Sequence, residues 1–234
     1  MPAFRATFLA FTAVALLGAA PLCAETVIYQ APGNAFFAWT TNDWGSVFEP
    51  DAATELPGGN EGEAANGQLL TFAGTERAVT RVTIKPLRVF TSGAFSASYT
   101  VSIYDVAGTL PGVLLWTGTS PIVPVSNSMA GLDFFPNITV PDTAIVAFST
   151  NSITGPQTTN VIGIAGQAQP PTIGAAPANQ YLAMDSATGQ WSTIAVQSAG
   201  YMGLTVYAVP GPRVLALVGV VPVVVRRRRV IARH

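Results

Sequence analysis

Hydrophobic and polar residues alternate along the middle of this 234-residue chain, most clearly between Ala97 and Tyr104. Tyr99, Val101 and Ile103 fall on one side of an extended segment, and the Ser and Thr residues between them fall on the other, because successive side chains of a strand point to opposite faces. This pattern is typical of a strand with one buried and one polar face. It predicts a β-strand whose hydrophobic side packs into a core.

A second alternating segment runs from Val79 to Lys85. Its two faces are expected to carry Thr80, Val82 and Ile84 on one side and Arg81, Thr83 and Lys85 on the other. Short hydrophobic runs bounded by Gly, Pro, Asn and Ser predict further strands. These are Thr26–Tyr29, Leu69–Phe72, Val113–Thr117, Gly131–Phe135, Ala144–Thr150, Val161–Ala165, Tyr181–Met184, Trp191–Val196 and Tyr201–Ala208.

Turn residues connect these predicted strands. Asp185–Gly189 lies between two of them and predicts a hairpin loop in which Gly189 adopts a positive φ. Asp105–Gly112 separates the clearest strand from the next one along the chain. Many short strands with regular turns indicate an all-β fold, and we expect an antiparallel, jelly-roll-like β-sandwich over residues 25–209.

The first 24 residues have the pattern of a secretory signal peptide. Arg5 supplies a positive charge, and an apolar stretch follows from Phe8 to Ala20. That stretch is shorter than the roughly 20 residues of a membrane-spanning helix but suits a signal-peptide core. We expect export through the Sec translocon and cleavage by signal peptidase after Ala24, which would also remove Cys23.

The C-terminal residues 210–234 place three features in a fixed order. A Pro-containing turn, Val209-Pro210-Gly211-Pro212, comes before an apolar segment from Val214 to Val225, and Arg226, Arg227, Arg228 and Arg229 follow directly. A basic cluster after an apolar segment keeps that end cytoplasmic. We therefore expect a short C-terminal membrane-sorting helix, with the preceding domain outside the membrane.

This order resembles the PEP-CTERM sorting signal of Gram-negative bacteria, in which a Pro-Glu-Pro motif, a transmembrane stretch and an arginine cluster follow one another. Pro210 and Pro212 match the two prolines, Gly211 replaces the Glu, and Leu215-Ala216-Leu217 matches the common start of the helix. The resemblance implies recognition by an exosortase, a membrane-embedded transpeptidase-like protease. It also implies transient anchoring in the inner membrane, then a place at the cell surface or outside the cell, in association with exopolysaccharide or biofilm.

Two segments of the body are similar to secreted choice-of-anchor domains. One is the predicted hairpin, with Ile103-Tyr104, Gly108 and the run Leu110-Pro111-Gly112-Val113-Leu114-Leu115-Trp116, and the other is Gly74–Thr80. Domains of this kind are β-sandwiches that occur with alternative C-terminal surface-sorting signals. The resemblance implies a β-sandwich over most of residues 25–209 and no enzymatic activity.

Charge is distributed unevenly among these segments. Charged residues make up 10% of the chain and hydrophobic residues 49%, which excludes a highly charged disordered chain. Residues 25–209 contain twelve acidic and four basic residues, a net charge of −8, whereas the tail from Arg213 contains six Arg and no acid. The overall net charge of −1 therefore averages an acidic domain with two basic ends.

The body offers few groups for catalysis or metal binding. The only His is His234 and the only Cys is Cys23, so the body has neither a His-based triad nor a thiol nucleophile or zinc–thiolate site. Six acidic residues without a basic one lie between Asp43 and Glu63. They are expected to form a solvated loop; the alternative is a Ca²⁺ site, whose oxygen ligands would include Asp43, Glu49 and Asp51. No other cofactor is expected.

Trp residues provide the candidate ligand-binding groups, because their rings can stack on sugars. Trp39 and Trp44 lie in a loop-rich region beside the acidic stretch and are the preferred candidates, whereas Trp116 and Trp191 fall in strand patterns and are expected in the core.

Three functions are compatible with these features. The first is an exported, non-enzymatic surface or matrix protein with no nucleic-acid partner; the alternatives are a carbohydrate-binding module and, less favoured, a secreted glycoside hydrolase with two carboxylates.

Overall fold

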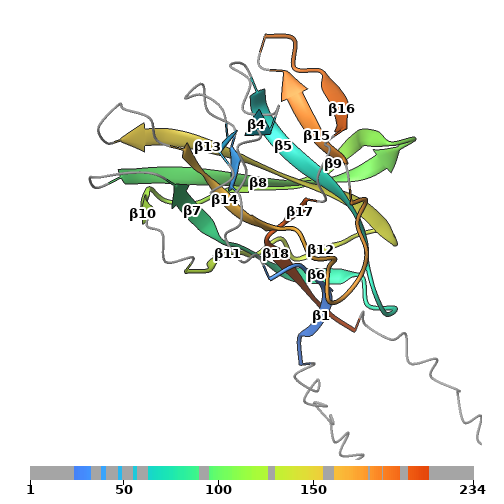
Figure 1. The fold of residues 1–234 in the computed structure, drawn as a ribbon. Helices are drawn as coiled ribbons and strands as arrows, with labels where there is room; N and C mark the ends of the chain where they lie inside the picture. Colours follow the sequence, from blue (N-terminus) through green and yellow to red (C-terminus); the bar gives the residue numbers. More distant parts are fainter. Residues whose placement is uncertain are drawn as a thin grey trace, which may run out of the picture.

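The computed structural model describes residues 24–32, 38–40, 47–48, 55–56, 63–89, 95–125, 130–154, 161–178, 180–185, 187–195 and 200–210. The regular elements in these residues are all β-strands, and the strands pair in antiparallel fashion (Figure 1). The expected all-β, antiparallel class is confirmed for this part of the chain.

Every segment that the sequence predicts to be a strand coincides with one or two strands. These are β1 (Thr26–Gln30), β5 (Glu63–Thr71), β6 (Ala78–Ile84), β8 (Phe95–Ala107), β9 (Leu110–Thr119), β11 (Leu132–Phe134), β13 (Thr143–Thr154), β14 (Val161–Gln167), β15 (Gln180–Asp185), β16 (Trp191–Ala195), β17 (Tyr201–Met202) and β18 (Leu204–Val209). Six further strands were not expected: β2 (Ala38–Thr40), β3 (Val47–Phe48), β4 (Glu55–Leu56), β7 (Pro86–Val89), β10 (Val123–Val125) and β12 (Ile138–Thr139). These are too short to display a period of two.

All strands but β3 and β4, which pair only with each other, form two large layers. One is a seven-stranded sheet in the order β10-β8-β13-β5-β15-β16, with β9 also paired to β8. The other begins as the five-stranded sheet β1-β18-β6-β11, with β12 also on β6, and continues into β17-β14-β2 with β7 on β14. The continuation is direct: the Ala165 N–H donates to the Lys85 carbonyl at 2.8 Å, and the Gly203 N–H donates to the Ala165 carbonyl at 2.7 Å.

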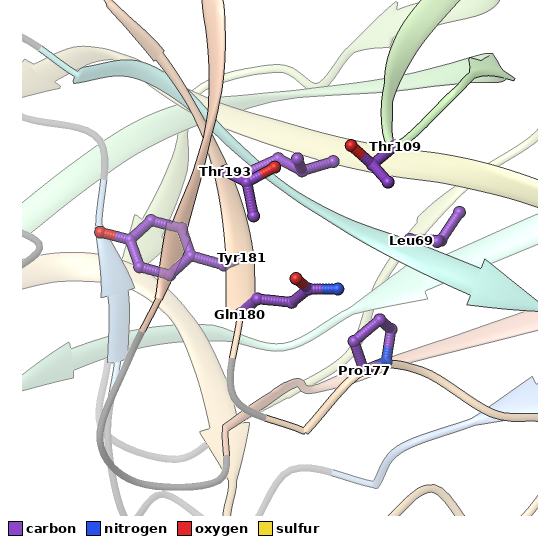
Figure 2. A pocket seen from close by; sticks show the side chains of 7 residues that line it. Leu69, Thr109, Pro177, Gln180, Tyr181 and Thr193 are labelled. Atoms are coloured by element: carbon purple, nitrogen blue, oxygen red, sulfur yellow. The ribbon is translucent and has the colours of Figure 1, made fainter.

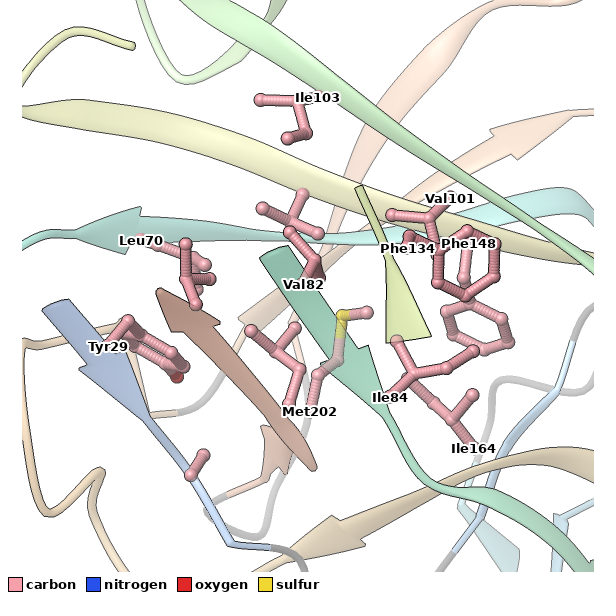
Figure 3. Close-up of a cluster of buried hydrophobic side chains, with 14 of the residues drawn as sticks. Tyr29, Leu70, Val82, Ile84, Val101, Ile103, Phe134, Phe148, Ile164 and Met202 are labelled. Atoms are coloured by element: carbon pink, nitrogen blue, oxygen red, sulfur yellow. The ribbon is translucent and has the colours of Figure 1, made fainter. Parts of the chain in front are cut away.

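Among the described residues, one hydrophobic core joins the two layers (Figure 3). The inner face of the seven-stranded sheet contributes Val101 and Phe148, which lie near Phe134 and Ile84 of the opposite layer in Figure 3. Along β8 the buried hydrophobic positions are Ala97, Tyr99, Val101 and Ile103. The predicted apolar face of this strand is therefore confirmed.

The prediction for β6 is partly wrong. Val82 and Ile84 are fully buried as expected, but the third core position is Val79 and not Thr80. The reason is an irregularity in the pairing with β18, where Tyr207 lies opposite Arg81 and the next partner pair is Ala208 with Val79. A bulge of this kind adds one residue and exchanges the faces beyond it.

The turn between β15 and β16 has the predicted geometry. Gly189 has φ +67°, and Asp185 Oδ1 accepts hydrogen bonds from the N–H of Ala187 at 3.0 Å and of Thr188 at 2.7 Å. The Thr188 hydroxyl donates to the same oxygen at 2.9 Å. The β8–β9 turn likewise places Gly108 at φ +69°.

The two ends of the domain lie side by side. Thr26 of β1 is paired with Ala208 of β18, and Glu25, just before β1, accepts hydrogen bonds from Arg81 at 2.7 Å and from the Thr80 hydroxyl at 2.8 Å. In Figure 1 the start of β1 and the end of β18 lie towards the bottom, whereas the β15–β16 turn lies at the top.

Candidate functional site

Most of the site residues predicted from the sequence lie outside the described residues. They are Trp44, Asp43, Glu49, Asp51, Gly211, Pro212, Val214, Leu215, Ala216, Leu217, Val225, Arg226, Arg227, Arg228 and Arg229. Trp39 lies in β2, opposite Ile164 of β14. Val209 ends β18, and Pro210 follows it half-buried. The functions expected of these residues stay predictions.

The outer face of the seven-stranded sheet carries uncharged polar side chains where β9, β8 and β13 lie side by side. The hydroxyls of Thr100 and Thr119 share a hydrogen bond of 2.7 Å, and those of Ser102 and Thr117 share one of 2.9 Å. These residues alternate along β8 with the side chains that fill the core, such as Val101. Their hydroxyls therefore face away from the core.

This polar surface continues onto β13. Ser149 lies opposite Thr100 in the strand register, and Asn151 Nδ2 donates to Thr100 Oγ1 at 3.1 Å and to Ser149 Oγ at 3.4 Å. We call the whole set the hydroxyl face. Its members are Thr100, Ser102, Thr117, Thr119, Ser149 and Asn151, and all of them are partly or fully exposed.

Two aromatic rings from distant strands meet on the same outer side of the sheet. The ring centroids of Tyr104 in β8 and Trp191 in β16 are 5.8 Å apart, with an interplanar angle of 71°, an edge-to-face contact. Three strands separate β8 from β16 in the sheet order, so a flat sheet would hold these two strands roughly 19 Å apart. The sheet must therefore curl until its outer face is concave.

The concave face is closely packed where β5 and β13 lie side by side. Ile145 and Ala147 are buried although they lie on the opposite side of β13 from the core residues Val146 and Phe148. A Cβ added at Gly67 would lie 3.2 Å from Ala147 Cβ and 3.3 Å from Ile145 Cγ2. A side chain at this point of β5 would therefore require its neighbours to shift by a few tenths of an ångström.

A small hollow opens between β5, β15, β16 and the β8–β9 turn (Figure 2). It is lined by Leu69, Thr109, Pro177, Gln180, Tyr181, Leu182 and Thr193. Its interior has room for about one water molecule. A ligand larger than water would therefore lie along the surface of the sheet and not inside this hollow.

The hydroxyl face is electrically neutral. Asp105 is the only charged residue of β8, β9 and β13, and its carboxylate accepts a hydrogen bond from the Val113 N–H near the hairpin turn. Arg77 and Arg81 belong to the opposite layer or its edge; Arg77 pairs with Asp142 at 2.8 Å, and Arg81 with Glu25 as described above. Hydrogen bonding and contact with rings are thus the interactions that this face offers.

Reactive groups are not assembled in the part of the chain that the structure describes. Within it, no three His, Cys, Asp or Glu residues come close enough together to hold a metal ion. Burial raises the pKa of Tyr29 and of Tyr99 far above the usual range, and Tyr201 raises that of Tyr29 further. Both phenols therefore remain protonated near neutral pH.

Two Trp residues that the sequence predicts to lie in the core are on different faces in the structure. Trp116 packs against the core as expected, with its ring centroid 6.5 Å from that of Phe134 in an edge contact. Trp191, in contrast, contacts Tyr104 on the outer face. The signal was available in the alternation of β16, because Ile194 packs against the core and residues at odd spacing from it face outward.

Comparison with known proteins identifies no relative, since no protein-family model, curated protein or solved structure matches the chain. Among the described residues, no helix is long and apolar enough to cross a membrane.

Proposed function

We propose that this chain is an exported, non-enzymatic protein of the cell surface or extracellular matrix, with a jelly-roll-like β-sandwich over residues 25–209. The shared core of two antiparallel sheets supports the sandwich. The leader over residues 1–24 and the PEP-CTERM-like tail over residues 210–234 support export and sorting. Its expected partners are the Sec translocon, signal peptidase and an exosortase-type protease, with exopolysaccharide outside the cell.

The order of features in the tail is the observation that carries this proposal, and the pairing of β1 with β18 makes it geometrically consistent. Because Thr26 lies opposite Ala208, the points at which the leader and the sorting tail join the domain lie side by side. A domain held at the membrane by its tail would then direct the β15–β16 turn away from the membrane (Figure 1).

The surroundings of the acidic side chains support a non-enzymatic function. The acidic residues whose side chains the structure describes each accept a hydrogen bond from a local backbone group or from a neighbouring polar side chain. They are Glu25, Glu76, Asp105, Asp133, Asp142 and Asp185. Carboxylates that stabilise strands and turns in this way are poorly suited to act as the facing pair of a glycoside hydrolase.

Removal of residues 210–234 tests the proposal. The full chain and the truncated chain are expressed in a Gram-negative host with an exosortase system, and the mature C-terminus is identified by mass spectrometry after cell fractionation. We expect the full chain to lose its tail and to reach the surface, and the truncated chain to accumulate in the periplasm.

A second variant, in which Arg226–Arg229 are replaced by Gln, serves as a matched control for the basic cluster. It should remain unprocessed, because the positive charges that hold the tail end in the cytoplasm are lost. Equal location of all three chains, or removal of the tail from the Gln variant as from the full chain, would contradict the proposal.

A further inference from the structure

We propose that the hydroxyl face and the adjacent Tyr104–Trp191 pair form a binding surface for a neutral polysaccharide chain. This inference rests on the proposed export, since such polymers are met outside the cell. It assigns the binding to the outer face of the seven-stranded sheet and not to Trp39 or Trp44. The ligand would lie across β9, β8 and β13.

The hydrogen-bonding capacity of the hydroxyl face matches that of sugar hydroxyls. Each Thr or Ser hydroxyl has one donor and two acceptor positions. The Thr100–Thr119 pair uses one donor and one acceptor internally, and Asn151 Nδ2 occupies another acceptor of Thr100. One donor and two acceptors therefore remain on this pair, and a sugar hydroxyl can both give and receive hydrogen bonds there.

The spacing of the hydroxyl face is regular. Along β8, Thr100 and Ser102 are two residues apart, which corresponds to about 7 Å, and each is hydrogen-bonded to a hydroxyl of β9 on the neighbouring strand about 4.8 Å away. A repeating array of this kind suits a repeating ligand.

Apolar contacts border the array on one side. Tyr104 follows Ser102 on the same face of β8, and its ring meets that of Trp191. Leu114 lies opposite Tyr104 in the register and is 48% exposed. Aromatic and aliphatic groups of this kind can contact the C–H faces of sugar rings, whereas the hydroxyl groups of the same sugars would face the Thr and Ser residues.

Charge determines which polysaccharide fits. The binding surface carries no cationic side chain, and residues 25–209 have a net charge of −8. An anionic polymer would be repelled at low ionic strength and would find no Arg or Lys on this face. The surface is therefore assigned to an uncharged glycan.

Co-sedimentation of the purified exported chain with insoluble polysaccharides tests this assignment. The probes are cellulose, β-1,3-glucan and starch as neutral polymers, and alginate beads as the anionic one. We expect retention on at least one neutral polymer and none on alginate at low salt. The double variant Thr117→Val/Thr119→Val removes two hydroxyls but keeps the β-branched shape, and Trp191→Ala removes one ring; each should weaken binding about tenfold.

The control Thr139→Val changes an exposed Thr of β12 in the other layer and should bind like the original chain. Circular dichroism and thermal unfolding establish that each variant is folded; if Trp191→Ala is not, the Thr double variant decides alone. Failure of the original chain to bind any neutral polymer, or undiminished binding by the double variant, would overturn the inference. Failure of the proposed export is seen separately, in the location of the chain in cells.

Discussion

The side chain of Gln68 and the backbone of Met202 join the two layers of the protein through a buried hydrogen bond. The Met202 N–H donates to Gln68 Oε1 at 2.9 Å, and Gln68 Nε2 donates to the Gly200 carbonyl at 3.1 Å. Gln68 belongs to β5 of the seven-stranded sheet and is only 1% exposed. One amide thus satisfies a backbone donor and a backbone acceptor that are both buried in the opposite layer.

Replacement of Gln68 by Leu should lower the free energy of unfolding by about 2–4 kcal/mol. The substitution leaves the Met202 N–H and the Gly200 carbonyl buried without this partner, and each unsatisfied group costs about 1–3 kcal/mol. Urea unfolding followed by Trp fluorescence measures the change. Gln169→Leu, at an exposed position, is the control and should stay within about 0.5 kcal/mol of the original chain; equal stability of the two variants would contradict this role of Gln68.

Substitution by Ala should reduce stability to different extents at two glycines with similar φ angles. Gly174 has φ +76°, and an added Cβ would lie 2.6 Å from the Thr71 carbonyl oxygen and 3.0 Å from the Tyr29 ring. Gly189 has φ +67° with open space around it. We expect Gly189→Ala to cost about 1–2 kcal/mol from backbone strain alone, and Gly174→Ala to cost about 1–3 kcal/mol more because of overpacking. Thermal unfolding of both variants provides the comparison, and a smaller loss for Gly174→Ala would disprove the close approach.

The β15–β16 turn should contribute a pH-dependent part of stability. The Thr188 N–H and hydroxyl, and then the Ala187 N–H, hold the pKa of the Asp185 carboxyl below its usual value. Since the folded pKa is the lower one, the stabilisation is present above the unfolded pKa of about 3.9 and is lost as the pH falls through the folded pKa.

An NMR titration measures this effect directly. The Asp185 midpoint in the protein should lie below that in a peptide of residues 183–191. Asp185→Asn keeps an acceptor oxygen but cannot titrate, so its stability should change less between pH 5 and the acid limit. Identical midpoints in protein and peptide would show that the turn hydrogen bonds do not favour the carboxylate.

Much of the fold could be predicted from the sequence because short apolar runs between turn residues mark the strands. The buried hydrophobic face of β8 could also be identified, because its apolar residues recur with a period of two, whereas β13 is buried on both faces from Ala144 to Phe148 and shows no such period. The burial of Val79 in place of Thr80 could not be predicted, because it depends on a bulge in the pairing of β6 with β18. Such a bulge is a property of two strands together and leaves no mark in either one.

The candidate site was harder to predict than the fold. The polar positions Thr100 and Ser102 were visible as the outer side of β8, but their hydrogen bonds to β9 required the strand register. The contact of Tyr104 with Trp191 depends on the curl of a sheet in which three strands lie between β8 and β16. Local alternation gives the side of each strand on which a residue lies, and it contains no information on curvature.

A buried phenol in the core should be replaceable with a gain in stability. Tyr99 is fully buried, and its hydroxyl has no hydrogen-bond partner among the described residues, so that folding removes this group from water without compensation. Tyr99→Phe keeps the ring and should raise the free energy of unfolding by about 1 kcal/mol. Tyr207→Phe is the matched control, because the ring of Tyr207 lies 3.8 Å from the Arg81 guanidinium and is only partly buried; its effect should stay within about 0.5 kcal/mol. Chemical denaturation of the three chains decides the matter, and a clear loss of stability in Tyr99→Phe would show that the hydroxyl has a stabilising partner.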